Sequence, residues 1–387
     1  MEGRQVVVTG ATQGIGREAA RQLAAQGARV VLACRDVERA EAVAEGIRRQ
    51  HPGAQVEVGP PLDLGSLESV RSFAAAYKKR HRRLDCLVNN AGTNYTKPWF
   101  TPEGVGGLCQ VNYLGHYALT RLLEDMLQAS APSRVVNVSS VTHRYGWVGE
   151  VGKFLSSWRP GSYYPSTKLA NVLFAYELQR RLGEHGVQSC AVDPGGVASN
   201  IWTGSVFSRP PLSWFIGNLY APPSDGAAAV VHAASVPWGQ ERKAAAAINA
   251  RWMGTDSSSN GSSHGRRRRH AAHAAPDLRF YARGLFASPA VTSWRGTPQD
   301  PAPGLLDRVR GALWGGTAVV ASLLDYPLRR ITGGRLNSGT RPAPSAPLSY
   351  NAGLAAQLWD LSADASGLPC EPQIAGAAAG ALASARD

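Results

Sequence analysis

The stretch of sequence that decides the fold is Gln5-Val6-Val7-Val8-Thr9-Gly10-Ala11-Thr12-Gln13-Gly14-Ile15-Gly16. Its β-branched start predicts a buried parallel strand, and a helical apolar pattern begins at Ala19. Glycines between strand and helix let the backbone turn tightly and approach a phosphate, which the N–H groups at the helix N-terminus can bind. The spacing is Gly-x-x-x-Gly-x-Gly, and it predicts a dinucleotide-binding turn formed by Gly10, Gly14, Ile15 and Gly16.

The end of the second predicted strand, residues 28–34, bears on which dinucleotide binds. The chain reads Arg35-Asp36 there, and Arg17 directly follows the glycine turn. Guanidinium groups match a 2′-phosphate bidentately, whereas a carboxylate at this position binds the ribose hydroxyls of NAD. Arg17 and Arg35 therefore favour NADP(H), and Asp36 keeps NAD(H) as the less favoured alternative.

A tyrosine and a lysine stand four residues apart at the start of a helical apolar pattern. They are Tyr164 and Lys168, and one helical turn places them on the same face. A neighbouring cation favours the ionised phenol, whose ordinary pKa is about 10, and so brings it closer to the range of acid–base catalysis. The pair predicts proton transfer to or from an alcohol or carbonyl oxygen.

With these motifs in place, the chain resembles the short-chain dehydrogenase/reductase superfamily and, within it, the retinol-dehydrogenase-like group. The resemblance covers roughly residues 1–236 and implies an α/β fold, a doubly wound parallel sheet of seven strands with helices on both faces. The segments that carry it, in the family's order, are residues 9–16, 33–36, 62–64, 89–92, 111–116, 136–140, 164–171 and 193–197.

The resemblance also implies roles for individual residues. Tyr164 would be the general acid and base, and Lys168 would lower its pKa and bind the nicotinamide ribose. Ser140, rather than the adjacent Ser139, would orient the substrate oxygen, and Asn112 would hold a water that links Lys168 to solvent. Asp63 would contact the adenine, Asn89 the adenosine side of the cofactor, and Ser199 the nicotinamide carboxamide. The further cofactor-binding residues would be Ala91, Gly92, Pro194, Gly195 and Val197.

The segment between Ser140 and Tyr164 is longer than in the smallest members of the family. It is rich in aromatic side chains, which suits a loop beside a site for an apolar substrate, and the alternative is a packed surface loop. These side chains are His143, Tyr145, Trp147, Phe154 and Trp158.

Four regions are expected along the chain. Residues 1–237 form the catalytic domain, and residues 238–332 form a basic, partly disordered insertion before the last strand. Residues 333–365 hold that strand, at 333–338, and a closing helix around 354–361, whereas the Ala/Gly-rich tail 366–387 is expected to be disordered.

The net charge of +13 is concentrated in the predicted insertion, which contains the run Arg266–Arg269. Residues 308–330 combine apolar side chains with flanking arginines, which is typical of a helix lying on an anionic membrane. The alternative is a helix packed on the catalytic domain, and nucleic-acid binding is not expected.

Several observations concern the cellular setting. The five cysteines show no metal-ligand spacing, which suggests a reduced compartment and no metal site. The first predicted strand begins within five residues of Met1, leaving no room for a signal peptide, and no apolar run reaches the roughly 20 residues that span a bilayer. We expect a cytoplasmic protein, with peripheral membrane association and a homodimer left open.

Together these patterns predict an NADP(H)-dependent oxidoreductase that transfers hydride between a lipophilic alcohol and its carbonyl. One alternative is a light-dependent pigment reductase from the same superfamily. A second is a non-catalytic nucleotide-binding scaffold, which would have no need to keep Asn112, Ser140, Tyr164 and Lys168 together.

Overall fold

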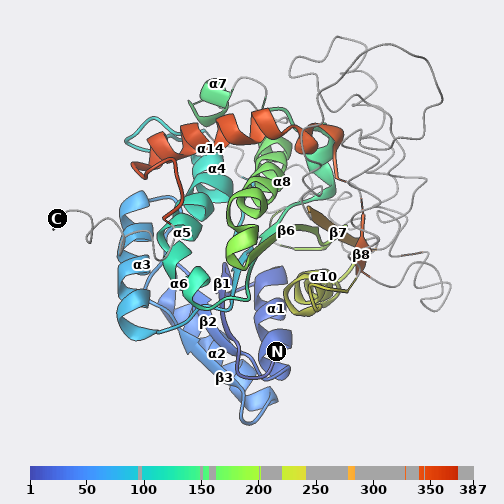
Figure 1. The fold of residues 1–387 in the computed structure, drawn as a ribbon. Coiled ribbons are helices and arrows are strands. Elements are labelled where there is room, and N and C mark those ends of the chain that lie inside the picture. Colours follow the sequence, from blue (N-terminus) through green and yellow to red (C-terminus); the bar gives the residue numbers. More distant parts are fainter. Residues whose placement is uncertain are drawn as a thin grey trace.

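A single twisted sheet forms the centre of the protein (Figure 1). The computed structural model describes residues 1–94, 98–148, 151–156, 163–199, 201, 220–240, 278–283, 327, 340–343 and 345–373. The strand order is β3-β2-β1-β4-β5-β6-β7-β8; all neighbours pair in parallel except β8, which is antiparallel to β7. The strands are β1 (Gln5–Thr9), β2 (Arg29–Ala33), β3 (Gln55–Val58), β4 (Cys86–Asn89), β5 (Ser133–Val138), β6 (Val187–Asp193), β7 (Arg279–Arg283) and β8 (Thr340–Pro342).

Helices cover both faces of the sheet. One face carries α1 (Gly14–Ala25), α2 (Val37–Gln50) and α10 (Pro223–Ser235). The other carries α3 (Leu67–Arg80), α4 (Gly107–Cys109), α5 (Gly115–Leu122), α6 (Glu124–Ala129), α7 (Val151–Ser156), α8 (Tyr163–Leu182) and α14 (Ala352–Ser366). Shorter turns are the π-helical η1 (Gln110–Leu114) and the 3-10 turns η2 (Val141–Tyr145), η3 (Gly183–His185) and η7 (Pro347–Tyr350).

The alternation of strand side chains explains why two separate cores form. In β1, Val7 packs into the core under α3, α5 and α8, whereas Val6 and Val8 pack into the core under α1 and α10. A strand buried on both faces reads as an uninterrupted apolar run, as the Val-Val-Val of β1 does. The predicted doubly wound parallel sheet is confirmed.

The strand order reverses direction beside β1, because β2 lies on one side of it and β4 on the other. In doubly wound sheets, ligands bind at the carboxyl ends of the strands near such a reversal. The predicted cofactor-binding residues other than Lys168 lie at or after the carboxyl ends of β1, β2, β3, β4 and β6, and Ser140 follows β5, so the topology brings them to one edge of the sheet.

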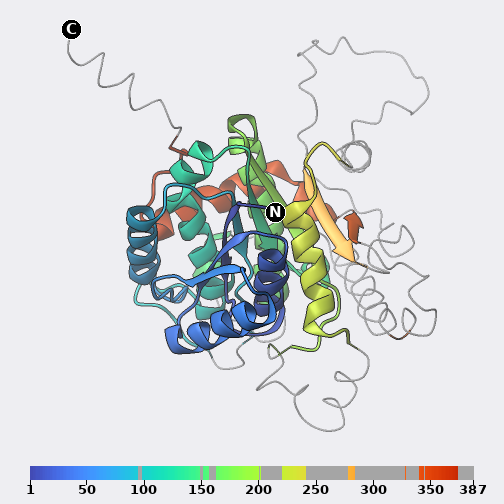
Figure 2. The same cartoon turned by 90° about the horizontal axis from the view of Figure 1, so that it is seen from below.

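The seventh parallel strand is not where the sequence was expected to place it. We expected it at residues 333–338, which lie outside the described residues, but β7 is formed by residues 279–283, inside the predicted insertion. Phe280, Tyr281 and Ala282 are fully buried against β6, and α10 runs beside β7 (Figure 2). The prediction was wrong because β7 is short and begins and ends with arginine, so it did not stand out in a basic region.

For the chain after β7, the prediction of a closing helix is confirmed, and other predicted features lie outside the described residues. The expected closing helix around 354–361 is the middle of α14. Of the segment 308–330 only residue 327 is described, and the aromatic Trp158 and the tail beyond 373 also lie outside the described residues.

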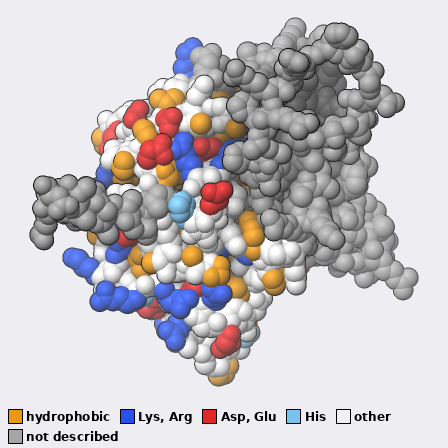
Figure 3. Space-filling view, viewed as in Figure 1, with side chains coloured by type: hydrophobic (Ala, Val, Ile, Leu, Met, Phe, Trp, Pro, Cys, Tyr) orange, Lys and Arg blue, Asp and Glu red, His pale blue; other side chains and the backbone are white. Residues whose placement is uncertain are grey.

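Two features of the described residues concern charge and membrane contact. Lys and Arg side chains gather where α3 ends, which complements the negative end of that helix dipole (Figure 3). Among the helices that the structure describes, none is both long and apolar enough to cross a bilayer.

Candidate active site

The glycine turn lies against the loop that follows β4. Gly10 has φ +65°, and a Cβ atom on it would lie 2.8 Å from the Cα of Ala91. Gly14 also has positive φ, at +55°. Only glycine fits such a conformation with so close a neighbour, so these two positions allow the turn between β1 and α1 to pack closely against the loop after β4.

Thr9 and Asn90 hold these two loops together, and neither was assigned a role from the sequence. The Thr9 hydroxyl accepts hydrogen bonds from the backbone N–H groups of Asn90 (2.9 Å) and Ala91 (3.0 Å). The Asn90 amide donates to the Thr9 carbonyl at 2.9 Å, and His116 of α5 is hydrogen-bonded to the Thr9 hydroxyl at 2.9 Å. The adjacency of Thr9 to the first glycine was the one available sequence signal.

The loop after β6 completes this part of the site. A Cβ atom on Gly14 would lie 3.7 Å from the Cβ of Ser199. At the start of α10, a Cβ on Gly226 would lie 3.4 Å from both Ile15 and Pro194, and closer still to Val197. The Gly195 N–H donates to Asp193 Oδ1 at 3.0 Å, which shapes the turn leaving β6. The predicted residues Ile15, Pro194, Gly195, Val197 and Ser199 therefore lie together beside the glycine turn.

The arginines predicted to select the cofactor lie on the surface near the ends of β1 and β2. Arg17 forms an ion pair with the neighbouring Glu18 at 3.0 Å, and Arg35 is exposed directly after β2. Asp36 is the N-cap of α2, and its carboxylate accepts the Arg39 N–H at 2.9 Å. This capping bond occupies part of the group that would bind a ribose.

A third arginine lies at the same place. The guanidinium of Arg39 donates to the Gln13 side chain of the glycine turn at 3.2 Å. Its position four residues after Arg35 on the first turn of α2 was the sequence signal for it.

Two predicted contacts to the adenosine half differ in their surroundings. Asp63 is partly exposed, and its Oδ1 accepts the Gly65 N–H at 2.9 Å. Asn89 is buried inside the sheet, where its amide donates to Thr120 (3.0 Å) and Asn137 (2.9 Å). The structure thus gives the Asn89 side chain a place in the core that braces β4 and β5.

The predicted catalytic groups meet where β5 ends and α8 begins. The hydroxyl of Ser140 lies beside the phenol of Tyr164, where it favours the ionised phenol and acts to lower its pKa. Ser139 points elsewhere, because its hydroxyl donates to the Lys168 carbonyl at 2.8 Å. The Ser139 hydroxyl is thus engaged with the backbone of α8, and the Ser140 hydroxyl faces Tyr164.

Lys168 lies beneath this pair and is only 2% exposed. Its Nζ donates to the Val138 carbonyl at 3.1 Å and lies 5.5 Å from the centre of the Tyr164 ring. A Cβ atom on Gly92 would lie 3.4 Å from this Nζ and 3.6 Å from Asn112 Oδ1. Lys168, Gly92 and Asn112 therefore lie within reach of one another.

Asn112 is held by a π-helical turn, a feature that often marks functional sites. Its amide accepts the Thr93 N–H at 2.8 Å and donates to the Thr93 carbonyl at 2.9 Å and the Thr167 hydroxyl at 3.2 Å. These bonds tie the loop after β4 to α8. The expected water beside Asn112 stays a prediction.

The pKa shifts of Tyr164 and Lys168 differ from those expected from the sequence. Burial raises the pKa of Tyr164 above its ordinary value, and of the groups around it the Ser140 hydroxyl opposes that rise. Burial also lowers the pKa of Lys168 to about 8. The pKa of Tyr164 is therefore raised and not lowered as expected, because desolvation of the phenol is the largest effect.

The expected aromatic loop is only partly exposed. Phe154 packs in the core against Tyr113, and His143 is fully buried. Tyr145, 37% exposed, and the partly exposed Trp147 remain at the surface near Tyr164. The segment is therefore partly packed, as in the alternative interpretation.

Known proteins resemble this chain in sequence. Retinol dehydrogenase 11 of Homo sapiens is 42% identical over 240 residues, which cover 60% of this chain and 73% of that protein. Retinol dehydrogenase 12 of Homo sapiens is 44% identical over 202 residues, which cover 52% of this chain and 64% of that protein.

Solved structures resemble it as well. An uncharacterised protein from Mycobacterium Paratuberculosis has a TM-score of 0.58 at 26% identity, with 96% of both chains covered. A protein described as an NAD(P)-dependent gluconate 5-dehydrogenase from Beutenbergia cavernae, with bound NADP, has a TM-score of 0.50 at 26% identity. That match covers 61% of this chain and 90% of the other.

A family model completes the comparison. The model described as short chain dehydrogenase matches residues 4–206, the region that holds the glycine turn, Ser140, Tyr164 and Lys168. This chain belongs to the short-chain dehydrogenase family and is an oxidoreductase related to the retinol dehydrogenases.

Proposed function

We propose that the protein uses NADP(H) to transfer hydride between a lipophilic alcohol and its carbonyl compound. The observation that carries the proposal is the placement of the Ser140 hydroxyl beside the Tyr164 phenol, with the ammonium of Lys168 buried 5.5 Å from the centre of the phenol ring. A hydroxyl pair of this kind can bind one substrate oxygen from two sides, at the edge of the sheet where the glycine turn lies.

The residues around the glycine turn fit a dinucleotide. The positive φ angles of Gly10 and Gly14 leave backbone N–H groups at the start of α1 for a pyrophosphate. Arg17, Arg35 and Arg39 supply positive charge for a 2′-phosphate, and Asp36 is engaged in capping α2. The cofactor supplies or accepts the hydride when it is bound.

The chain's own residues then handle the proton. In carbonyl reduction, the Tyr164 phenol donates its proton to the oxygen that becomes the alcohol, and the Ser140 hydroxyl donates a hydrogen bond to the same oxygen. Lys168 stabilises the phenolate left behind, since its buried ammonium lies 5.5 Å from the centre of the Tyr164 ring. In alcohol oxidation the same groups act in reverse.

Two observations support a lipophilic substrate. Tyr145 is exposed near Tyr164, and Trp147 of the same segment is partly exposed. Trp99 and Phe100 are exposed on the loop after β4. The related human proteins with 42–44% identity are retinol dehydrogenases.

A substrate panel tests the proposal. The purified protein is given NADPH or NADH with long-chain aldehydes, all-trans-retinal, short aldehydes and sugars, and cofactor absorbance is followed. We expect turnover with NADPH and the long apolar aldehydes, and little with sugars.

Each contrary result corrects a different part of the proposal. A preference for NADH would reject the role of the arginines, and turnover confined to sugars would reject the lipophilic substrate. Tight NADPH binding with no turnover across the panel would favour a nucleotide-binding scaffold.

A further inference from the structure

His143 is a buried side chain that touches the catalytic serine and that the mechanism above does not use. Its Nδ1 lies 2.6 Å from the backbone carbonyl oxygen of Ser140, and its ring is fully buried. On the other side of the ring, Nε2 lies 3.0 Å from the backbone nitrogen of Ala346. The imidazole therefore links Ser140 to Ala346, which lies 203 residues after His143 in the chain.

These two partners determine where the proton of the ring lies. The Ala346 N–H can only donate, so Nε2 must be the acceptor and carry no proton. Nδ1 must then carry the proton and donate it to the Ser140 carbonyl. Protonating Nε2 would place an N–H against an N–H, so both contacts require the neutral ring. Burial, and next the adjacent Arg144, lowers the pKa of His143 well below its ordinary value, which agrees with this geometry.

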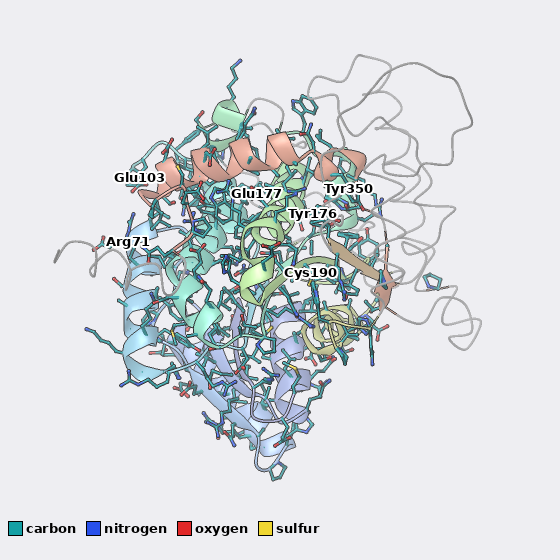
Figure 4. All side chains as sticks on the ribbon, in the orientation of Figure 1. Arg71, Glu103, Tyr176, Glu177, Cys190 and Tyr350 are labelled. Atoms are coloured by element: carbon teal, nitrogen blue, oxygen red, sulfur yellow. The ribbon has the colours of Figure 1, made fainter. Side chains whose placement is uncertain are left out.

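The segment behind His143 is itself anchored to the helix that carries Tyr164. The hydroxyls of Ser345 and Tyr176 are hydrogen-bonded at 2.8 Å, and the Ser345 N–H donates to the Tyr350 hydroxyl at 3.3 Å. The rings of Tyr176 and Tyr350 lie 5.4 Å apart, and both are labelled in Figure 4. Residues 345–350 are thus attached to α8 at one point and, through His143, to Ser140 at another.

Strand β7 holds the ring from a further side. Phe280 packs against the imidazole with ring centres 4.9 Å apart. The position of His143 is therefore set by β7, residues 345–350 and the turn η2, which begins directly after Ser140.

We propose that His143 is a positioning residue that keeps the Ser140 hydroxyl beside the Tyr164 phenol by donating a hydrogen bond from its Nδ1–H to the Ser140 carbonyl, with residues 345–350 as its fixed support. The inference rests on the proposed function, because it assigns Ser140 and Tyr164 to the reaction. The carbonyl of Ser140 accepts from the His143 N–H as well, at 3.0 Å, so losing the imidazole bond loosens the serine without removing the turn.

Two substitutions of His143 test its two hydrogen bonds separately, the one made by Nδ1 and the one made by Nε2. An asparagine amide nitrogen can take the place of Nδ1 and keep the donor to Ser140, but it cannot reach Ala346. A glutamine oxygen can take the place of Nε2 and keep the acceptor for Ala346, but it leaves the Ser140 carbonyl without this donor. His143→Asn and His143→Gln form a matched pair of polar substitutions at one buried position.

The first measurement needs no substrate. The protein is labelled with ¹³Cζ-tyrosine, the Tyr164 resonance is assigned with Tyr164→Phe, and Ser140→Ala shows how it moves when the serine hydroxyl is lost. We expect His143→Gln to move the Tyr164 resonance in the direction of Ser140→Ala, and His143→Asn to leave it near wild type. A Tyr164 resonance that moves in Ser140→Ala but stays at its wild-type position in His143→Gln would overturn the proposal.

The second measurement is a double-mutant cycle on turnover. We expect His143→Gln to lower kcat roughly tenfold with little change in KM for NADPH, as a small misplacement of a catalytic group can do. In a Ser140→Ala background the same change should cost less than about twofold, because the two residues act through one contact. If His143 were merely structural, His143→Gln would lower kcat by the same factor in the wild-type and Ser140→Ala backgrounds. His143→Gln and His143→Asn would also lower Tm by similar amounts.

The two measurements keep this inference apart from the proposed function. If wild-type protein turns over no carbonyl compound while the Tyr164 resonance responds as expected, the proposed function fails and the positioning role stands. If turnover is found and the resonance is indifferent to His143→Gln, the positioning role is rejected alone.

Discussion

Residues 1–199 and residues 278–373 contribute to the site in different ways. In the first region, each predicted site residue lies directly after a strand or on a helix beside it. The second region contributes β7, β8 and α14 and none of the predicted catalytic or cofactor-binding residues. Its contacts with the first region are long in sequence, for example 242 residues between Tyr117 and Trp359. The comparison teaches that short local motifs supply the chemistry, whereas distant contacts hold it in place.

Trp359 of α14 packs against several side chains of the first region and is the largest fully buried side chain among the described residues. It is 1% exposed, its ring lies 4.5 Å from the guanidinium of Arg121 and 4.7 Å from that of Arg181, and its carbonyl accepts the Tyr117 hydroxyl at 3.1 Å. The second region therefore stabilises α5 and α8 directly.

Removing this side chain should give the largest effect. We expect Trp359→Ala to lower the free energy of unfolding by about 3–5 kcal/mol, the usual cost of such a cavity. NADPH binding should persist below the lowered Tm, because the glycine turn lies in the first region. Chemical denaturation and NADPH titration measure the two quantities.

The neighbouring Asp360, with a half-exposed side chain, is the control. Asp360→Ala should change the free energy of unfolding by less than about 0.5 kcal/mol. Loss of NADPH binding in folded Trp359→Ala protein would show that the division between the two regions is wrong.

The next substitution removes a proposed catalytic hydroxyl and should leave the fold unchanged. We expect Tyr164→Phe to lower turnover by at least about 100-fold, since a positioned proton donor is lost. Its Tm should stay within a few degrees of wild type and its Kd for NADPH within a few-fold. Tyr163→Phe, one position earlier in the chain, is the control and should retain activity. Equal loss in the two variants would reject the assignment of Tyr164.

The same division explains what could be predicted from the sequence. The glycine turn, Ser140, Tyr164 and Lys168 were predictable because each sits in a short pattern beside an apolar strand or helix. The capping role of Asp36 was also readable, since Asp is a favoured N-cap before a helical pattern. Asp36 was considered only as a possible ribose ligand, and the cap was therefore not identified.

Other features depend on burial, which a local pattern does not reveal. Asn89 lies in a loop-like motif, yet its amide braces two strands inside the sheet. The shifted pKa values of Tyr164 and Lys168 follow from desolvation by the packed chain. The place of β7 depends on pairing with β6 across the long segment after α10.

Lys168 allows the cost of burial to be measured through pH. Its pKa is lowered from 10.5 to about 8 in the folded protein. Between these values the unfolded chain binds more protons than the folded chain, so the free energy of unfolding rises with pH. Relative to Lys168→Met, wild type should gain about 2 kcal/mol in unfolding free energy between pH 8 and pH 10.

Denaturation of both proteins across this range checks the expectation, and Lys168→Gln is a second neutral reference that should agree with Lys168→Met. A difference that stays constant with pH would mean that the ammonium of Lys168 is not desolvated as the structure indicates.

The smallest expected effect concerns the arginines at the ends of β1 and β2, where the site is exposed and the contacts are weakest. We expect Arg35→Ala to weaken NADPH binding about tenfold, or about 1.4 kcal/mol, and to leave NADH binding nearly unchanged. The loss should be modest because Arg35 is exposed and shares the surface with Arg17 and Arg39.

Arg49→Ala is the control, since Arg49 lies at the far end of α2 and forms an ion pair with Glu45 at 2.8 Å. Calorimetric titration of both cofactors checks the expectation. Equal loss of NADPH and NADH would assign Arg35 to the shared part of the dinucleotide, and wild-type protein that binds NADH more tightly would assign the ribose to Asp36 despite its capping bond.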